Sequence, residues 1–214
     1  SASNSVLATG SWIKVGTTQN GLYKITYSQL QSSGLIGGSV NSNYLKLYGN
    51  GGGTLPEENS KFRYDDLQEN AIEVVDGGDG NFDANDYLLF YGQGAHQWTF
   101  NWADSSKFTH TYNVYADTNF YYITIGTSNG LRLTNRTSLG GVPNYSTSTG
   151  DGYTFREDDL ESLTKSGRQW MGDYFNFNNT YTYNFNLADI SITDSIKAIV
   201  KVAARCVACP TTMN

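Results

Sequence analysis

The sequence has little charge and an excess of acids. Asp, Glu, Lys and Arg make up 16% of its 214 residues, against about 25% in an average soluble domain. The 20 acids outnumber the 14 bases, which gives a formal net charge of −6. A surface that binds phosphate groups must carry the opposite sign, so nucleic acid and anionic membranes are excluded as expected partners.

Long apolar segments are also missing. No run approaches the ~18 apolar residues that a membrane-spanning helix needs, so we expect no membrane span. The first residues, Ser1 to Ser5, lack the basic and apolar regions of a secretory signal. We therefore expect such a signal to be absent or already removed.

Cysteine and histidine are scarce, which limits the chemistry available. The two cysteines, Cys206 and Cys209, have the spacing of a redox motif or of half a zinc site. No second Cys/His pair completes a zinc site, and His96 and His110 are remote in the sequence. Apart from Arg205, nothing local activates either thiol. We expect two small residues near a strand end, with a local disulfide or thiol function as the alternative, and assign no catalytic residue.

Aromatic residues are abundant, with 16 Tyr, 10 Phe and 4 Trp. Short runs rich in β-branched and aromatic residues recur between Gly, Asn, Asp and Ser, which is typical of an all-β sandwich or barrel. Within several runs, apolar and polar side chains alternate, as a half-buried sheet requires. The predicted strands are residues 11–15, 21–26, 44–48, 71–75, 87–91, 97–101, 120–125, 180–186 and 196–203.

The predicted fold class is therefore all-β, a β-sandwich or jelly-roll-like arrangement of antiparallel sheets with one or two short helices. One helix is expected at residues 28–34, with Ser28 as N-cap and Gly34 as the left-handed residue at its end. A second is expected at residues 156–163, whose acids suit a first turn. A Gly/Ser/Thr-rich loop at 139–152 would separate a β lobe, 1–138, from a β segment, 153–214, that completes the sandwich.

An acidic, glycine-rich loop at residues 76–86 is a candidate cation site. Its second half, from Asp79 to Asp86, matches part of a calcium-binding loop, in which Gly makes a sharp turn and the last acid closes the site. Only Asp76 precedes Asp79, so the first half is one residue short. The candidate ligands are Asp76, Asp79, Asp83 and Asp86, with calcium as the possible cofactor. An ordinary Asx- and Gly-rich connection between strands is the alternative.

The four tryptophans are Trp12, Trp98, Trp102 and Trp170. With the Tyr-rich strands they could form a sugar-stacking platform or a protein interface. Core packing is the alternative that we expect for most of them, because a charge-poor sandwich needs bulky apolar volume.

Several blocks of the sequence also resemble a known family. They are residues 21–25 with Leu30 and Gly34, then 47–56, 66–69, 79–87 with Phe90 and Tyr91, and 166–172. In order and spacing, over roughly residues 10 to 205, they resemble the amino-terminal, non-catalytic region of the type IX secretion sortases. These sortases belong to the gingipain family of caspase-like cysteine peptidases.

The resemblance implies a piece of a larger exported protein of the Bacteroidetes, located at the outer-membrane-associated cell surface. It implies that a peptidase domain with a catalytic His and Cys follows this chain. Because the chain stops four residues after Pro210, soon after a strand-like run, we expect the last sheet to lack a partner. In related gingipains the amino-terminal region is a β-sandwich that packs on the peptidase. The expected partners are thus the downstream peptidase domain and secretion-system proteins.

Within the last block, Arg168 and Trp170 share a face if the segment is extended. A guanidinium beside an indole is common at protein–protein hot spots, so we expect this pair to anchor the module. A tryptophan core plug with an Arg–acid pair is the alternative. A rival for the whole chain is a free-standing adhesive or carbohydrate-binding sandwich. A reading frame that continues into a peptidase domain would favour the first function over the second.

Overall fold

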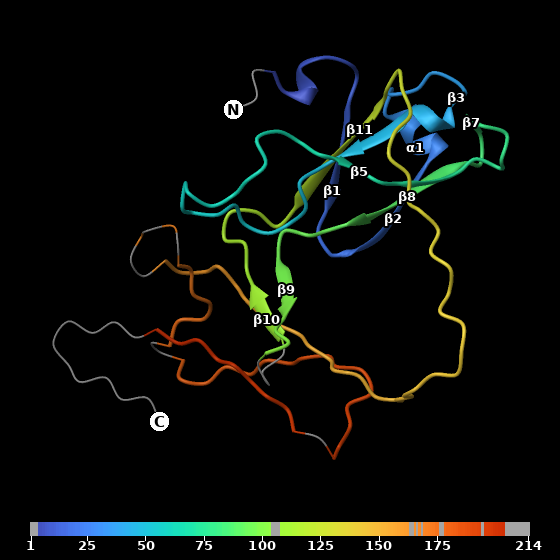
Figure 1. Ribbon diagram of the computed structural model, residues 1–214. Helices are drawn as coiled ribbons and strands as arrows, with labels where there is room; N and C mark the ends of the chain where they lie inside the picture. The colour runs from blue at the N-terminus through green and yellow to red at the C-terminus, as the bar shows by residue number, and fades with distance from the viewer. Residues whose placement is uncertain are drawn as a thin grey trace. The chain divides into compact units, whose positions relative to one another are not determined.

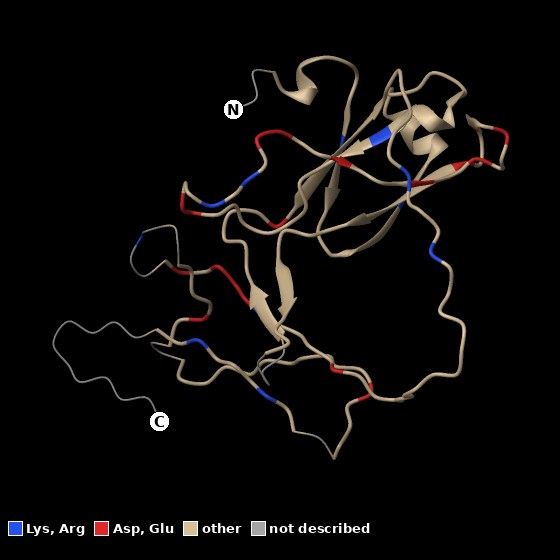
Figure 2. Cartoon of the chain, in the orientation of Figure 1, with Lys and Arg blue, Asp and Glu red and all other residues tan. Residues whose placement is uncertain are grey.

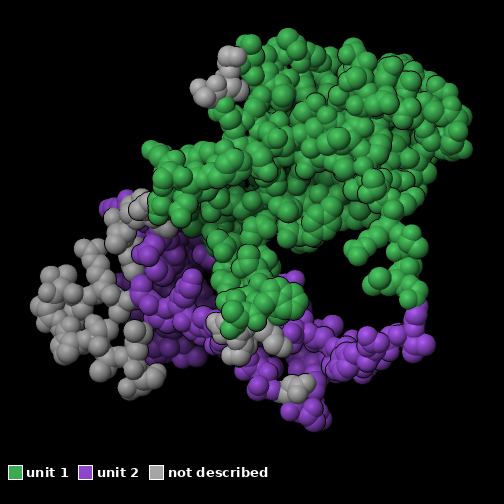
Figure 3. Space-filling view, in the orientation of Figure 1, with its two compact units in different colours: residues 1–140 green, residues 141–214 purple. Residues whose placement is uncertain are grey.

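The computed structural model describes residues 4–103, 108–162, 165, 167, 169–175, 178–193 and 195–203. The chain divides into two compact units, residues 1–140 and 141–214, which Figure 3 colours separately. The division falls inside the segment 139–152 that the sequence predicts as a loop. Among the described residues, all helices and strands lie in the first unit.

Two main sheets form unit 1 (Figure 1). A four-stranded sheet has the order β1 (Ile13–Thr17), β11 (Asn119–Ile125), β4 (Leu45–Tyr48) and β5 (Glu69–Asn70). A three-stranded sheet has the order β2 (Gly21–Thr26), β8 (Tyr87–Gly92) and β6 (Glu73–Val75). Two strand pairs complete the unit, β3 (Val40–Asn41) with β7 (Asn81–Phe82) and β9 (Gln97–Phe100) with β10 (Phe108–Thr111). All these pairs are antiparallel, which confirms the all-β fold class.

The two main sheets share one hydrophobic core. Successive side chains of a strand point to opposite faces, so every second residue can be buried. In β4 and β11, Leu47 lies opposite Ile123, and they are 1% and 0% exposed. The rings of Phe90, from β8, and Tyr121, from β11, contact each other across the sheets with centroids 5.2 Å apart. This contact between sheets gives unit 1 a sandwich-like interior.

The helix α1 (Tyr27–Ser32) begins one residue before the predicted start. Thr26, and not Ser28, is its N-cap, because its hydroxyl accepts from the backbone N–H of Gln29 at 3.3 Å. The Gln29 side chain returns a bond to the N–H of Thr26 at 2.8 Å, which completes a capping box. Leu30, within the helix, is fully buried, and Gly34 has a φ of +80° as predicted. The other helices are the short 3₁₀ turns η1 (Val6–Ala8) and η2 (Ser42–Tyr44).

The strands predicted between residues 11 and 125 are present, with ends within two residues of the predicted ones. The predicted strands at 180–186 and 196–203 are wrong, because these residues form no strand ladder. In the described part of unit 2, β pairing is limited to an isolated bridge between Glu161 and Met171. A strand is stable only beside a neighbour that pairs with its backbone, and these segments have none there.

The predicted helix at 156–163 is also wrong, since its described residues 156–162 are not helical. A helix this short is marginal unless packing stabilises an apolar face. Here Leu160 is 64% exposed, and Arg156 forms an ion pair with Asp158 at 2.7 Å.

Candidate functional site

The acidic loop predicted as a cation site connects β6 to β8 and contains the short strand β7. Three glycines, Gly77, Gly78 and Gly80, have positive φ angles of 68°, 86° and 80°, which side chains with a Cβ rarely adopt. Asn85 also has a positive φ, of 82°. The loop is thus a chain of tight turns.

The carboxylates of this loop accept hydrogen bonds from the loop's own backbone. Asp76 Oδ1 accepts from the N–H of Gly78 at 3.0 Å, and Asp79 Oδ1 accepts from that of Asn81 at 2.8 Å. Asp86 Oδ2 accepts from the N–H of Asp83 at 2.7 Å. A hydrogen bond from the Ser42 side chain, followed by that of Gly78, lowers the pKa of Asp76 below its ordinary value. These are the contacts by which Asp residues stabilise turns.

The described residues contain no group of three or more His, Cys, Asp or Glu placed to hold a metal ion. The carboxylates of Asp76, Asp79 and Asp86 accept backbone N–H groups of the loop, as the turn interpretation predicts. Calcium binding by this loop stays a prediction. The hydrogen bonds of this loop fix the path of the chain between β6 and β8.

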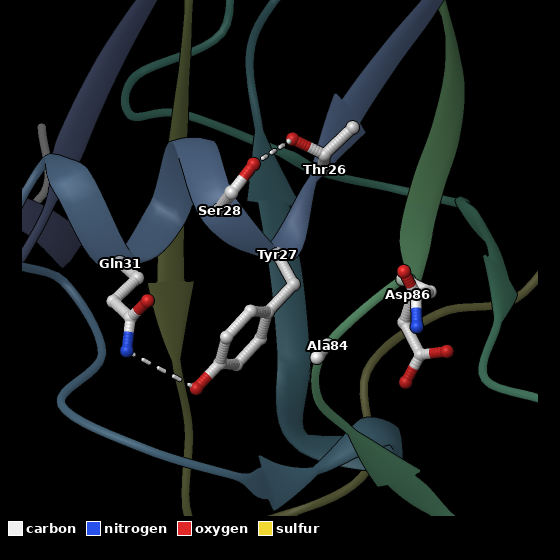
Figure 4. A pocket seen from close by; sticks show the side chains of 7 residues that line it. Thr26, Tyr27, Ser28, Gln31, Ala84 and Asp86 are labelled. Atoms are coloured by element: carbon white, nitrogen blue, oxygen red, sulfur yellow. Dashed lines mark hydrogen bonds between the residues drawn. The ribbon is translucent and has the colours of Figure 1, made fainter.

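A surface hollow of about 410 Å³ lies beside the end of this loop. It is lined by Thr26, Tyr27, Ser28, Gln31, Ala84, Asn85 and Asp86. Figure 4 shows Gln31 and Tyr27 on one wall, where the Gln31 amide donates to the Tyr27 hydroxyl at 3.4 Å. The hydroxyls of Thr26 and Ser28 are 3.0 Å apart. Asp86 supplies the one carboxyl of this lining, whose other polar side chains are hydroxyls and amides.

Of the predicted anchor pair, Arg168 and Trp170, the structure describes Trp170. Trp170 is 37% exposed, so it is not a core plug. The neighbouring Met171 exchanges backbone hydrogen bonds of 2.8 and 2.9 Å with Glu161. Arg168 lies outside the described residues, so its place beside Trp170 stays a prediction. Cys206 and Cys209 also lie outside them.

The expectation that most tryptophans pack in the core is wrong. Trp12 and Trp98 are half-buried, Trp102 is 91% exposed and Trp170 is 37% exposed. Aliphatic side chains with Phe and Tyr fill the core instead. Trp12 lies at its margin, where its ring meets that of Tyr48 edge-on at 5.3 Å.

An aromatic ribbon, formed by β9 and β10, is a feature that the sequence analysis missed. Trp98 pairs with His110 and Phe100 with Phe108 across the strands, with ring centroids 4.6 and 5.1 Å apart. Beyond the ladder, His96 stacks on Tyr112 at 4.2 Å. Rings occur at every second position, at 96, 98 and 100 and again at 108, 110 and 112. This spacing places the rings of each run on one face of a strand, and it could have predicted the ribbon.

The ring geometry of this ribbon does not favour the sugar-stacking platform. The Trp98 and His110 planes are inclined by 47°, and those of Phe100 and Phe108 by 63°. A platform for sugars presents flat ring faces, whereas the rings within these two pairs are inclined to each other, those of Phe100 and Phe108 edge-to-face. His96 Nδ1 accepts from the N–H of Asn113 at 3.1 Å, and this bond helps to fix the orientation of the His96 ring.

Large apolar side chains are exposed along the carboxyl-terminal part of unit 2. Ile192 is 99% exposed, and the alternating run that begins at residue 196 is exposed over its whole length. The exposed residues of this stretch are Ile190, Ile192, Ile196, Ile199, Val200 and Val202. The described chain contains no helix long and apolar enough to cross a bilayer.

The chain was compared with family models, curated proteins and solved structures, and its likeness is to a solved structure. No family model and no curated protein matches the chain. Among solved structures, the chain is similar to the dimeric latent PorU from Porphyromonas gingivalis, with 27% sequence identity and a TM-score of 0.48. The match covers 65% of this chain and 12% of that one, so the chain spans a small part of the length of the protein it resembles.

Proposed function

We propose that this chain is a non-catalytic module of a larger, exported cysteine peptidase related to the type IX secretion sortases of the gingipain family. In this proposal the module docks onto the peptidase domain of the same protein and assembles with secretion-system proteins at the cell surface. The sequence blocks that resemble the sortases are the basis for proposing this kind of parent protein. The structure supports the docking role through unit 2.

The observation that carries the proposal is the exposed apolar run at 196–203. Ile196, Val200 and Val202 alternate with Lys197 and Lys201 along it. The three apolar side chains are 68%, 78% and 57% exposed. Contiguous exposed apolar surface usually marks an interaction site, and unpaired strand-forming backbone is a template with which a strand of another chain or domain can pair. A sheet of another domain would cover the apolar surface and pair with this backbone.

The blocks that carry the resemblance support a structural role for unit 1. Tyr23, in the first block, stacks on Phe90 with centroids 5.6 Å apart. Phe82, in the acidic loop, is fully buried, and its ring centroid is 6.0 Å from that of Tyr27. These residues pack the core and present no reactive group. A module that docks onto another domain needs a stable core of this kind.

The docking role is tested by binding in trans. The chain and the remaining part of its parent protein, read from the natural open reading frame, are purified separately, and their association is measured by calorimetry. We expect binding that Val200→Asp weakens at least ~10-fold, because it places a charge in an apolar contact. Lys201→Gln, on the opposite face of the run, serves as the matched control. Absence of binding by the unaltered chain would contradict the proposal.

The non-catalytic part of the proposal needs its own assay. We expect no turnover of peptide substrates by this chain alone, because no nucleophile–base pair is identified in it. Turnover that disappears in Cys206→Ala or Cys209→Ala would refute this expectation.

A further inference from the structure

The connection between β4 and β5, residues 49–68, is a long loop with no regular secondary structure. Loops longer than ~12–15 residues are uncommon in compact domains and are usually functional. Its two ends are tied together. Gly49 N–H donates to Gln68 O at 2.9 Å, and the Asn50 amide donates to Asp66 O at 3.2 Å while accepting from Gln68 N–H at 2.9 Å. These bonds join the two ends of the loop.

The middle of the loop is held by Arg63. One guanidinium nitrogen, Nη2, donates to the carbonyl oxygens of Pro56 at 3.3 Å and Glu58 at 3.2 Å. The N–H of Lys61 also donates to Glu58 O, at 3.1 Å. Since these bonds lie within the loop, its shape is set before any partner binds.

Two rings flank Arg63 and are directed away from the core. Phe62 is 76% exposed and Tyr64 is 52% exposed, and they meet edge-on with centroids 5.1 Å apart. Leu55, in the same loop, is 74% exposed. Rigid aromatic side chains on a pre-organised loop lose little entropy on binding, which is characteristic of interface hot spots.

The charge of the loop indicates what covers these rings. Residues 54–66 contain four acids, Glu57, Glu58, Asp65 and Asp66, and two bases, Lys61 and Arg63, for a net charge of −2. Figure 2 shows these positions along the loop. Arg63 donates to carbonyl oxygens of the loop but stays exposed, so the net charge of −2 is carried at the surface. Contact with a second copy of the same acidic loop would bring like charges together.

We propose that loop 49–68 is a docking loop, whose occupant is a protein surface with an apolar pocket for Phe62 and Tyr64 and a rim of Lys and Arg. This inference rests on the proposed function: the surface that binds the loop belongs to the other part of the parent protein. The loop provides a contact from unit 1 that is independent of the apolar run at 196–203.

The test compares variants of the full 214-residue chain for binding to the separately purified remainder of the parent protein. We expect Phe62→Ala with Tyr64→Ala to weaken association at least ~10-fold. The matched control is Tyr115→Ala, which removes a ring that is 71% exposed elsewhere in unit 1. We expect Glu57→Gln with Asp65→Asn to weaken association at low salt and to reduce its dependence on salt. Unfolding midpoints equal to that of the unaltered chain establish that the variants are folded.

The outcomes separate the two proposals. If the unaltered chain does not bind, the proposed function fails, and the docking loop fails with it. If the unaltered chain binds and the double ring variant binds equally well, the docking loop alone is overturned. Self-association of the chain that requires Phe62 would also overturn it, in favour of a second copy as the occupant.

Discussion

At Gly49 the packing leaves no room for a side chain. An added Cβ would lie 2.8 Å from Cε1 of Tyr121, closer than carbon atoms approach. Tyr121 cannot move easily, since it is 2% exposed and its hydroxyl accepts from the N–H of Gln93 at 3.0 Å. The sequence shows a glycine cluster at 49–53 but not which glycine faces a ring, because the partner lies more than seventy positions away.

We therefore expect Gly49→Ala to lower the free energy of unfolding by about 1–3 kcal/mol, the usual effect of overpacking. Gly37→Ala is the control, because Gly37 has no atom within 4 Å of an added Cβ. Urea denaturation measures both variants. Equal losses in the two would mean that the Tyr121 contact is not the cause of the effect.

Asp66 joins the amino-terminal segment to the docking loop. Its carboxylate accepts from the N–H of Leu67 at 2.8 Å, from that of Val6 at 2.6 Å and from the Ser5 hydroxyl at 3.0 Å. These bonds, that of Leu67 first, lower the pKa of Asp66 below its ordinary value. The sequence contains the pair Asp65 and Asp66, but nothing local distinguishes the one that binds residues sixty positions earlier.

The lowered pKa of Asp66 predicts the sign of a pH effect. The ionised form is favoured in the folded state, so its stabilisation is complete above the unfolded pKa, about 4, and is lost as pH falls through the folded pKa. We expect Asp66→Asn to be less stable than the unaltered chain at neutral pH, with a difference that shrinks in acid. Denaturation curves from neutral pH to pH 3 measure it. A difference that stays constant with pH would rule out this linkage.

At the scale of elements, alternation located the strands but not their partners. The alternating pattern at 21–26 and 87–91 correctly predicted β2 and β8. Both strands form because they pair with each other. The equally regular pattern at 180–186 predicted a strand that the structure lacks. Alternation identifies which face is apolar, whereas a ladder also depends on a second strand far away in the sequence. The aromatic ribbon shows the same limit, since its paired rings belong to two strands that become adjacent only in the fold.

The acidic loop is the element whose role most needs an experiment. Because Asp86 accepts a part-buried hydrogen bond from Asp83, we expect Asp86→Ala to lower the free energy of unfolding by about 1 kcal/mol with or without calcium. If the loop binds calcium, millimolar calcium should instead raise the melting temperature of the unaltered chain by mass action. Asp83→Ala should then abolish that rise. Equal melting curves in calcium and in chelator would leave the loop as a turn.

At the scale of the whole molecule, the described core is confined to unit 1. The buried hydrophobic residues run from Ile25 to Ile123. The sequence predicted that residues 153–214 complete the sandwich, because composition and alternation are as strand-like there as in unit 1. Neither property reveals whether a segment buries its apolar face within its own chain or against another domain. The candidate docking sites were equally hidden, because Phe62 and Tyr64 differ from core aromatics only in their surroundings.

This distribution of the core predicts that unit 1 unfolds as the cooperative part of the chain. Cooperative unfolding comes from burial that is lost all at once, and in the described residues that burial lies before residue 125. We therefore expect a chain that ends at Gly140 to keep the free energy of unfolding of the full chain to within about 0.5 kcal/mol, and nearly the same denaturant dependence, since little additional surface is exposed when unit 2 unfolds. Urea denaturation followed by tryptophan fluorescence measures both, because Trp12, Trp98 and Trp102 remain in the shortened chain. A large loss of stability on shortening would show that unit 2 completes the core, as the sequence predicted, and would count against its apolar run as a docking site.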